Sequence, residues 1–455
     1  MRRSTSPPQE RGGADWLEIF MSPIPSYQLN GPPRRIAMIT HSFYESDNRV
    51  LRYAETLARR GDLVEVAALR RSAKMPKEEV IKGVRVFRLQ DRPGKTEKSK
   101  LAFLGPVLRF LLVSSWWLTR RHLRARYDLV HVHNIPDFLV FAAWLPKLMG
   151  AKVLLDIHDI VPEFYASKFS EAGDSRTVKA LKLVERASAR FASHVILANH
   201  LWFDQYVARS AASGKCSVFI NNVDGQVFQR RRRTRLDDKR IILFPGGLQW
   251  HQGLDIAIRA MPLVLECIPL AEFHIYGEGG RKEELMALAR ELGLTVQVRF
   301  FDPRPVSEIA EVMAQADLGV VPKRADSFGN EAYSTKIMEF MSLGVPVVAS
   351  STKIDRFYFN DSVVRFFESG NPAALAEAVV EVLQKDGLRR HLVSNALDYA
   401  EQNSWQHRQH AYLALVDALI QSRPLPLDEK TADNHHGWKS PSADVAAEID
   451  KLVVK

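Results

Sequence analysis

The pattern of apolar and polar positions near the start of the chain predicts a strand, a helix and a second strand. The run RIAMIT, Arg35–Thr40, follows a proline-rich stretch and precedes a polar loop, as a buried strand does. We predict a helix over Asn48–Arg60, ended by Gly61, and another strand in LVEVAAL, which begins at Leu63. A strand–helix–strand unit of this spacing implies a parallel sheet.

The same alternation continues to about residue 222 and places polar side chains at the ends of strands. Further strands are predicted from Val84, Leu129, Lys152, Ser193 and Ser217. In an open α/β sheet, ligands gather beyond the carboxyl ends of the strands. The polar residues at or near such ends are His131, His133, Asp156, His158 and Asp159.

A second alternating series begins at Arg240. Strands are predicted in RIILFPGG, AEFHIYGEGG, VQVRFF, DLGVVP and VPVVAS, and helices over residues 254–265, 281–292, 306–315 and 336–343. Two such series predict an α/β fold with two Rossmann-like, doubly wound parallel-sheet domains that face each other across a cleft.

The basic, non-periodic stretch QRRRRTRLDDKR, residues 229–240, is predicted to link the two domains. Either it is a solvated charge run, or it also touches anionic lipid. The predicted division is a flexible N-terminal head (1–33), a first domain (34–228), the linker (229–240), a second domain (241–400), a C-terminal helix that packs back on the first domain (401–421) and a flexible tail (422–455).

Length and composition agree with two folded domains. With 455 residues, 46% of them hydrophobic and 25% charged, the chain is too long for one ordinary core. A net charge of +10 suits an anionic partner. This charge is modest for the length, and neither a stacking motif nor a recognition-helix pattern accompanies it. We therefore expect no nucleic acid as a partner.

Two features bear on the cellular compartment. Cys216 and Cys267 are isolated in the sequence, and we expect both to be buried thiols in a reducing environment. The first 35 residues contain no apolar core segment of a secretory signal. We therefore predict a cytoplasmic protein, and peripheral attachment to the inner face of the cytoplasmic membrane stays open.

Residues 101–127, LAFLGPVLRFLLVSSWWLTRRHLRARY, combine an apolar, aromatic stretch with a basic end. Gly105, Pro106 and Arg109 interrupt the apolar run, which leaves it short of the about 20 residues that a membrane span needs. One interpretation is a crossover helix with one face buried on the sheet. A second interpretation adds an anionic membrane surface as a partner, because Trp116 and Trp117 precede a cluster of arginines.

The most informative segment is SFGNEAYSTKIMEFMSLGVPVVAS, residues 327–350. Glu331 falls in a loop, whereas Lys336 and Glu339 share a face if a helix begins near Thr335. A carboxylate accepts two hydroxyl hydrogen bonds at once, which suits a sugar or a ribose diol. The free N–H groups of a helix N-terminus suit a diphosphate. Two glutamates at this spacing are a weak signal alone, and their setting between two buried strands gives them specificity.

This segment resembles the donor domain of retaining GT-B glycosyltransferases, specifically family 4, also called glycosyltransferase group 1. The resemblance also rests on the stretches VFINNVDGQVF, PGGLQWHQGLDIAI, HIYGEGG, ADLGVVP and GVPVV. It covers roughly residues 34–420 and is strongest over 241–350. It implies the GT-B fold, transfer of a sugar, and a nucleotide sugar, a UDP- or GDP-sugar, as co-substrate without any other cofactor.

The resemblance implies roles for residues of the second domain. Glu331 would lie beside the donor sugar and its anomeric carbon, and Glu339 would hold the ribose hydroxyls. The turn formed by Gly246 and Gly247 would let the backbone approach the diphosphate, and Gly277 belongs to the glycine-rich turn of HIYGEGG.

Two departures from the family concern the cations that normally offset the charge on the leaving diphosphate. The usual arginine is Gly247 here, and the usual lysine is Gln252, which we still count among the donor-binding residues. Either the chain is inactive, or another cation substitutes. We predict Lys336 in that donor-binding and catalytic role. Lys323, Arg324 and His251 are reserves.

In the first domain, the resemblance places His158, within DIHDIVPE, near the donor sugar as a catalytic residue. The alternative is a histidine that Asp156 or Asp159 holds for structural reasons. The candidates for the acceptor side are His41, Arg49, Asp159 and Glu163. Asp47 is predicted to be the N-cap of the helix that carries Arg49.

The resemblance and the residues together predict a retaining hexosyltransferase. It would use a saccharide or polyprenyl-linked acceptor in cell-surface polysaccharide assembly. The family's proposed front-face displacement lets the leaving phosphate take the acceptor proton, and Glu331 as a covalent nucleophile is the alternative. No Asp-x-Asp motif stands in a suitable loop, so we expect no bound metal. A silent relative that acts as a partner or glycan-binding subunit, and a nucleotide-sugar 2-epimerase, stay open.

Overall fold

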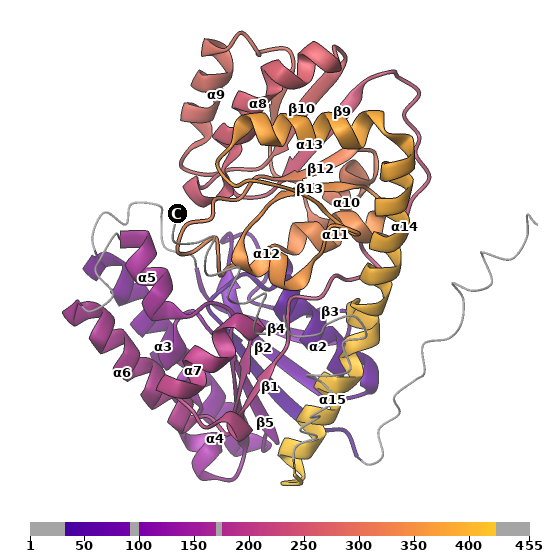
Figure 1. Ribbon diagram of the computed structural model, residues 1–455. Helices are drawn as coiled ribbons and strands as arrows, with labels where there is room; N and C mark the ends of the chain where they lie inside the picture. The colour runs from indigo at the N-terminus through magenta and orange to yellow at the C-terminus, as the bar shows by residue number, and fades with distance from the viewer. Residues whose placement is uncertain (1–31, 92–99, 170–174, 425–455) are drawn as a thin grey trace, which may run out of the picture.

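Two parallel sheets form two domains, which lie one above the other in Figure 1. The computed structural model describes residues 32–91, 100–169 and 175–424. The first sheet has eight strands in the order β3-β4-β2-β1-β5-β6-β7-β8, and the second has six in the order β11-β10-β9-β12-β13-β14. The predicted α/β fold with two parallel-sheet domains is confirmed. Apart from residues 32–33 and 422–424, the predicted head and tail lie outside the described residues.

The strands of the first sheet are β1 (Arg35–Thr40), β2 (Leu63–Arg70), β3 (Glu78–Ile81), β4 (Val84–Asp91), β5 (Leu129–His133), β6 (Lys152–Ile157), β7 (His194–Leu197) and β8 (Cys216–Val218). Those of the second sheet are β9 (Arg240–Pro245), β10 (Ala271–Tyr276), β11 (Val298–Phe301), β12 (Leu318–Val321), β13 (Val347–Ser350) and β14 (Arg365–Phe367). All the predicted strands are present. The sequence pattern missed β3, an exposed antiparallel edge strand, and β14, which has three residues.

The helices of the first domain are α2 (Asn48–Arg60), α3 (Lys100–Arg124), α4 (Trp144–Leu148), α5 (Val161–Phe169), α6 (Arg176–Phe191) and α7 (Phe203–Arg209). Those that follow are α8 (Leu254–Cys267), α9 (Lys282–Glu291), α10 (Val306–Ala314), α11 (Thr335–Leu343), α12 (Lys353–Tyr358), α13 (Pro372–Gln384), α14 (Asp386–Gln402) and α15 (Trp405–Ile420). Helix α2 has the predicted caps: the Asp47 carboxylate accepts from the Val50 N–H, and Gly61 adopts φ +104°.

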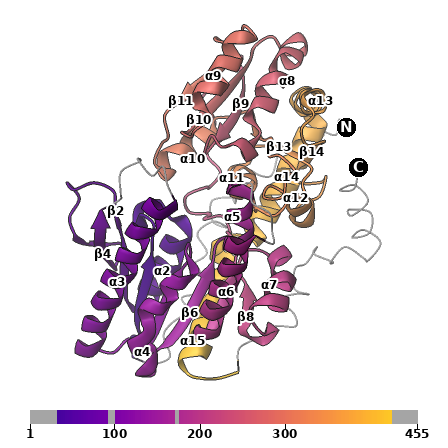
Figure 2. The ribbon, with the colours of Figure 1, turned by 90° about the vertical axis from the view of Figure 1, so that its left-hand side faces the viewer.

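The last helix, α15, runs from the second domain back along the first (Figure 1 and Figure 2). The Trp405 indole N–H donates to Thr56 Oγ1 over 2.8 Å, and the Tyr412 ring stacks on Tyr53 at 4.2 Å between centroids. Both aromatic residues belong to the same buried cluster as strands β1 and β2. The chain therefore crosses twice between the domains, first between β8 and Val223, which is buried with Phe228 in the core of the second domain, and again before α15.

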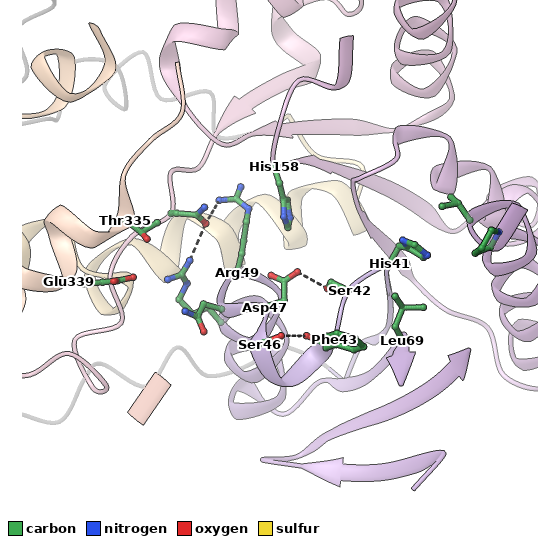
Figure 3. Close-up of a pocket in the computed structure, with 15 residues that line it drawn as sticks. His41, Ser42, Phe43, Ser46, Asp47, Arg49, Leu69, His158, Thr335 and Glu339 are labelled. Atoms are coloured by element: carbon green, nitrogen blue, oxygen red, sulfur yellow. Dashed lines mark hydrogen bonds between the residues drawn. The ribbon is translucent and has the colours of Figure 1, made fainter. Parts of the chain in front are cut away.

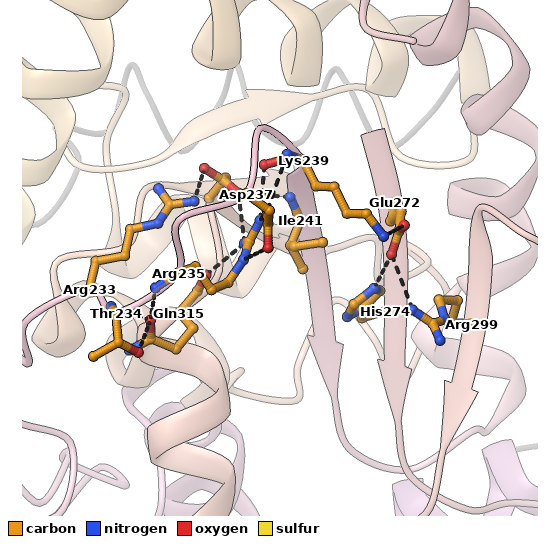
Figure 4. Close-up of polar contacts among 11 residues, drawn as sticks. Arg233, Thr234, Arg235, Asp237, Lys239, Ile241, Glu272, His274, Arg299 and Gln315 are labelled. Carbon is orange, nitrogen blue, oxygen red and sulfur yellow. Dashed lines mark hydrogen bonds and ion pairs between the residues drawn. The ribbon is translucent and has the colours of Figure 1, made fainter. Parts of the chain in front are cut away.

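Residues 229–240 are mostly exposed, as a solvated charge run is, and several of them also form ion pairs. Arg233 and Arg235 both bind the buried carboxylate of Asp317, at 2.6 and 3.1 Å, and Asp317 also accepts from the Ile241 N–H (Figure 4). Next to this group, Glu272 binds Lys239, His274 and Arg299. Part of the arginine run therefore fixes the entry to β9.

Helix α3 buries one face, on which Phe110 and Leu118 are fully enclosed, and it exposes Leu112 (70%) and Trp116 (62%) on the other. Within the described residues, no helix is long and apolar enough to cross a membrane. The expectation of two buried thiols is half right. Cys216 is buried under the first sheet, but Cys267, the last residue of α8, is exposed.

Candidate functional site

A pocket with a volume of about 560 Å³ lies between the two domains. The loop after β1, the start of α2 and the end of β6 form its first-domain wall, and the start of α11 forms the opposite wall (Figure 3). The polar lining residues on which its chemistry depends are His41, Asp47, Arg49, Arg52, His158, Asn221, Thr335 and Glu339.

The buried carboxylate of Asp156, at the end of β6, organises the first-domain wall. Arg49 Nε and Nη2 donate to its two oxygens at 2.8 and 2.7 Å. His133 Nδ1 and His158 Nε2 each lie 3.0 Å from Asp156 Oδ2. Burial alone would raise the pKa of Asp156, but the Arg49 guanidinium and these hydrogen bonds hold it well below its usual range. Arg49 therefore has a structural partner as well as a place in the pocket wall.

His158 is both held and accessible. Its Nε2 lies 3.0 Å from Asp156 Oδ2 and 3.2 Å from His133 Nδ1, and its side chain is 19% exposed into the pocket. Asp156, and not Asp159, is thus the carboxylate that orients it. The contact fixes the ring at the pocket wall.

The other acceptor-side candidates differ in how free they are. His41 lines the pocket, and burial against Phe110 lowers its pKa to about 4, so it is neutral at physiological pH. Burial raises the pKa of Asp159 to about 6. Glu163 accepts from Arg209 Nη1 at 2.6 Å and from Gln205 at 2.8 Å. Because of that ion pair, Glu163 is less free to contact an acceptor substrate than the sequence suggested.

On the opposite wall, α11 begins at Thr335, where the sequence predicted it. Thr335 and Glu339 line the pocket one turn apart and point toward the first domain (Figure 3). Gly344 ends the helix with φ +72°. Burial raises the pKa of Glu339, although Lys336 and Thr335 oppose the shift. A partly desolvated carboxylate beside a helix N-terminus suits hydroxyl donors and a nearby phosphate.

Lys336 lies against the glycine turn that follows β9. A Cβ on Gly246, which adopts φ +138°, would meet Lys336 Cε at 2.5 Å. A Cβ on Gly277 would meet the Gly246 carbonyl oxygen at 1.8 Å, so both glycines allow this close packing. Lys336 Nζ lies 3.4 Å from Gln252 Oε1, and burial lowers its pKa. The structure thus brings Lys336, Gly246, Gln252 and Gly277 together.

Glu331 lies in the loop before α11, as predicted, but it is not among the described residues that line the pocket. Its Oε2 accepts from the Trp202 indole N–H at 3.3 Å, and its carbonyl oxygen accepts from Asn199 Nδ2 at 3.1 Å. Both partners come from the first domain. Burial raises the pKa of Glu331. The residue therefore joins the two walls at one side of the cleft.

Two of the three reserve cations, Lys323 and Arg324, have carboxylate partners. Lys323 Nζ lies 2.9 Å from buried Asp355 and donates to the Ala332 carbonyl oxygen at 2.7 Å. Arg324 donates to Asp255 at 2.5 Å, and its guanidinium covers the Trp250 ring at 3.6 Å. Neither is as free for a diphosphate as the sequence suggested. His251 packs edge-on against Phe328, with ring centroids 5.0 Å apart.

Three buried side chains have the composition of a metal site, with ligand atoms of His131, His133 and Asp156 within 4.8 Å of one another. Arg49 already compensates the Asp156 carboxylate, and the Tyr412 hydroxyl lies 3.0 Å from His131 Nδ1. A divalent ion would have to lie beside this guanidinium, which disfavours it. The expectation that no metal binds stays a prediction.

Sequence reasoning missed Arg52, Asn221 and Trp202. Arg52 stands one turn after Arg49, and this i, i+3 spacing on a predicted helix was the signal that could have found it. Asn221 lies in the stretch VFINNVDGQVF that carries part of the family resemblance, whereas Trp202 gave no comparable signal, since its contact with Glu331 depends on how the two domains meet.

Two family models match the chain: "Glycosyl transferase 4-like domain" over residues 46–222 and "Glycosyl transferases group 1" over residues 226–398. A D-inositol 3-phosphate glycosyltransferase of Actinosynnema mirum is 28% identical over 394 residues, which cover 80% of this chain and 90% of that protein.

Solved structures share the fold at low identity. A sucrose-phosphate synthase from Thermosynechococcus elongatus superposes with a TM-score of 0.67 and 20% identity, covering 84% of this chain and 98% of that one. HepE from Anabaena, in complex with UDP-glucose, gives a TM-score of 0.60 and 19% identity, with 83% and 98% covered.

Proposed function

The chain belongs to the group 1 glycosyltransferases of GT-B fold, and on that premise we propose that it is a retaining hexosyltransferase that uses a UDP- or GDP-sugar. The observation that carries the proposal is the wall formed by α11, where Thr335 and Glu339 line the interdomain pocket. Lys336 of the same helix is not among the described lining residues and packs against the Gly246 turn. The UDP-glucose complex of HepE, which shares the fold, is consistent with such a donor.

In this proposal, Glu339 accepts hydrogen bonds from the two ribose hydroxyls, and the start of α11 faces the diphosphate. The two hydroxyls of a diol supply hydrogen bonds in place of those that the carboxylate lost when burial removed part of its water. The raised pKa of Glu339 supports this role, because a carboxylate that lacks full solvation gains most from new donors.

Lys336 offsets the charge that develops on the leaving diphosphate. It replaces the two cations that relatives carry where this chain has Gly247 and Gln252. Its Nζ lies 3.4 Å from Gln252 Oε1, so the ammonium of Lys336 lies next to the residue that stands in place of the family's lysine. A preorganised cation in a site of low dielectric stabilises such charge strongly.

Retention of configuration follows from a front-face displacement. The acceptor hydroxyl forms the new bond to the anomeric carbon on the side that the diphosphate leaves, and a phosphate oxygen takes the hydroxyl proton. The protein supplies position and cationic stabilisation, with His158 fixed at the pocket wall by Asp156. The contact of Glu331 with Trp202 favours this route over a covalent intermediate on Glu331.

The acceptor in this proposal is a saccharide, carried on a polyprenyl lipid at a membrane during cell-surface polysaccharide assembly. Exposed apolar side chains on α3 and α4 support the lipid surface: Leu112 is 70%, Trp116 62% and Leu148 79% exposed. Arg120 covers the Trp116 ring at 5.4 Å. An aromatic and aliphatic face next to cations suits an anionic membrane.

Flotation with vesicles that contain phosphatidylglycerol tests this surface. The wild-type protein should float, and Trp116→Ala should remain at the bottom. Val296→Ala, which truncates an equally exposed apolar residue of the second domain, is the control and should float. If the wild-type protein stays at the bottom as well, the acceptor is not presented at an anionic membrane.

A thermal-shift screen against UDP-, GDP-, ADP- and CMP-sugars tests the donor proposal. A ligand that binds only the folded protein raises the melting temperature by mass action. We expect a rise with a UDP- or GDP-sugar that is absent in Glu339→Ala. A wild-type protein that responds to none of the four would favour a catalytically silent relative.

Because the proposed reaction needs no divalent ion, turnover should be unchanged by a chelator.

A further inference from the structure

Two guanidinium groups meet at one neutral oxygen in the first-domain wall of the pocket. Arg49 Nη1 and Arg52 Nη2 both donate to Asn221 Oδ1, at 3.1 and 3.2 Å. Arg52 Nη1 also donates to the Asn222 carbonyl oxygen. Two cations that share a neutral acceptor repel each other, and an anion nearby offsets that repulsion.

The two arginines differ in what compensates them. Arg49 forms a bidentate ion pair with Asp156. Over residues 32–91, 100–169 and 175–424, no carboxylate lies within ion-pair distance of Arg52, and its acceptors are the amide and the carbonyl oxygen just named. Burial and the neighbouring Arg49 lower the pKa of Arg52. Asp224 and Glu339 act on Arg52 only from beyond ion-pair distance, and a partly buried guanidinium without a carboxylate in contact is unusual in a folded protein.

Arg52 also faces the donor side of the cleft. It lines the same pocket as Thr335 and Glu339 of the second domain. In that domain, Gly247 and Gln252 stand where the family resemblance implies two cations, and Lys323 and Arg324 already have carboxylate partners. Arg52 therefore brings a positive charge to the pocket from the first domain, which the donor-domain motif of the family does not cover.

We propose that Arg52 binds a phosphoryl group of a ligand held between the two domains. This inference rests on the proposed function and deepens it, because it adds a first-domain cation to the binding of phosphate. The phosphate belongs either to the diphosphate of the donor or to a phosphorylated acceptor. A planar guanidinium matches phosphate oxygens in pairs, which a lysine in the same place cannot do.

Calorimetric titration at a temperature where every variant is folded tests the proposal. UDP, or GDP if the wild-type protein prefers it, is titrated into wild type, Arg52→Gln, Arg52→Lys and Arg59→Gln. Arg59 lies on the same helix but is exposed, away from the pocket, and serves as the matched control. A second series titrates inorganic phosphate into protein saturated with the nucleotide.

If the donor supplies the phosphate, Arg52→Gln weakens nucleotide binding by about tenfold or more, Arg52→Lys weakens it less, and Arg59→Gln leaves it unchanged. If the acceptor supplies it, nucleotide binding is unchanged in Arg52→Gln, but inorganic phosphate binds the nucleotide-loaded wild type and not the variant. Unchanged affinity for both ligands in Arg52→Gln would overturn the role of Arg52 and leave the proposed function standing. A wild-type protein that binds no nucleotide would remove both.

Discussion

Apart from Arg52 on the first-domain wall, the two walls of the cleft differ in how their charges are compensated. On the first-domain wall, Asp156 is surrounded by Arg49, His133 and His158. On α11 of the second domain, burial desolvates both Lys336 and Glu339. Within the described residues, the one hydrogen bond of the Lys336 ammonium goes to the neutral Gln252 oxygen, at 3.4 Å. Compensated charges stabilise the fold, whereas charges left without full solvation or partners are ready to bind a ligand.

The largest expected loss of stability follows removal of the cation on the compensated wall. Arg49→Met leaves the buried Asp156 carboxylate without its guanidinium, and we expect the free energy of unfolding to fall by about 3–5 kcal/mol. Urea denaturation measures this change. Arg59→Met, at an exposed position of the same helix, should change stability little. An equal loss in both variants would mean that the Asp156 network does not stabilise the fold.

Two lysines sharpen the comparison within the second domain. Lys323→Met separates a buried ion pair with Asp355 and should lower the free energy of unfolding by about 3 kcal/mol. Lys336→Met removes a desolvated ammonium that has no carboxylate partner within ion-pair distance among the described residues, so stability should stay level or rise. Denaturation of the two variants side by side distinguishes them. Greater destabilisation by Lys336→Met than by Lys323→Met would contradict the assignment of Lys336 as a ligand-binding cation.

Asp137 is an exception in the first domain, because its buried carboxyl accepts from the Asn134 amide at 2.8 Å instead of from a cation. Burial raises its pKa to about 7. An acid whose pKa rises on folding binds its proton more tightly in the folded state, so stability falls as the pH rises from about 4 to about 7.

Asp137→Asn should remove this pH dependence. We expect the variant to be more stable than wild type at pH 8, by on the order of 2 kcal/mol, and to show no gain at pH 4. Melting temperatures at the two pH values measure the difference. Asp238→Asn, at an exposed position, is the control. The same difference between Asp137→Asn and wild type at both pH values would show that Asp137 does not titrate in this range.

The smallest effect is expected in the linker. Arg233→Gln removes one partner of Asp317, but Arg235 and the Ile241 N–H remain, and the Arg233 side chain is 43% exposed. We expect a loss below about 1 kcal/mol. Thermal denaturation at low and at high salt measures it. A loss of several kcal/mol would mean that the arginine run stabilises the domain arrangement much more than its exposure suggests.

The fold was predictable because both sheets are parallel and buried, so apolar runs and intervening helices mark them clearly. Edge strands such as β3 and short elements such as β14 lack that signal. On the donor side, the motif placed Glu339 and Lys336 on one helix. Sequence reasoning could not tell that Lys323 binds Asp355, that Glu331 contacts Trp202, or that Arg52 lacks a counter-ion. These facts depend on contacts between segments more than 30 residues apart.

The most direct measurement is the release of nucleoside diphosphate from a donor sugar that the wild-type protein binds, at saturating donor. The account predicts that Lys336→Met lowers turnover by about 10²–10³-fold, because it removes the cation that stabilises the leaving diphosphate. Folded Lys323→Met protein should retain turnover near that of wild type. Turnover of Lys336→Met equal to that of wild type would contradict the account.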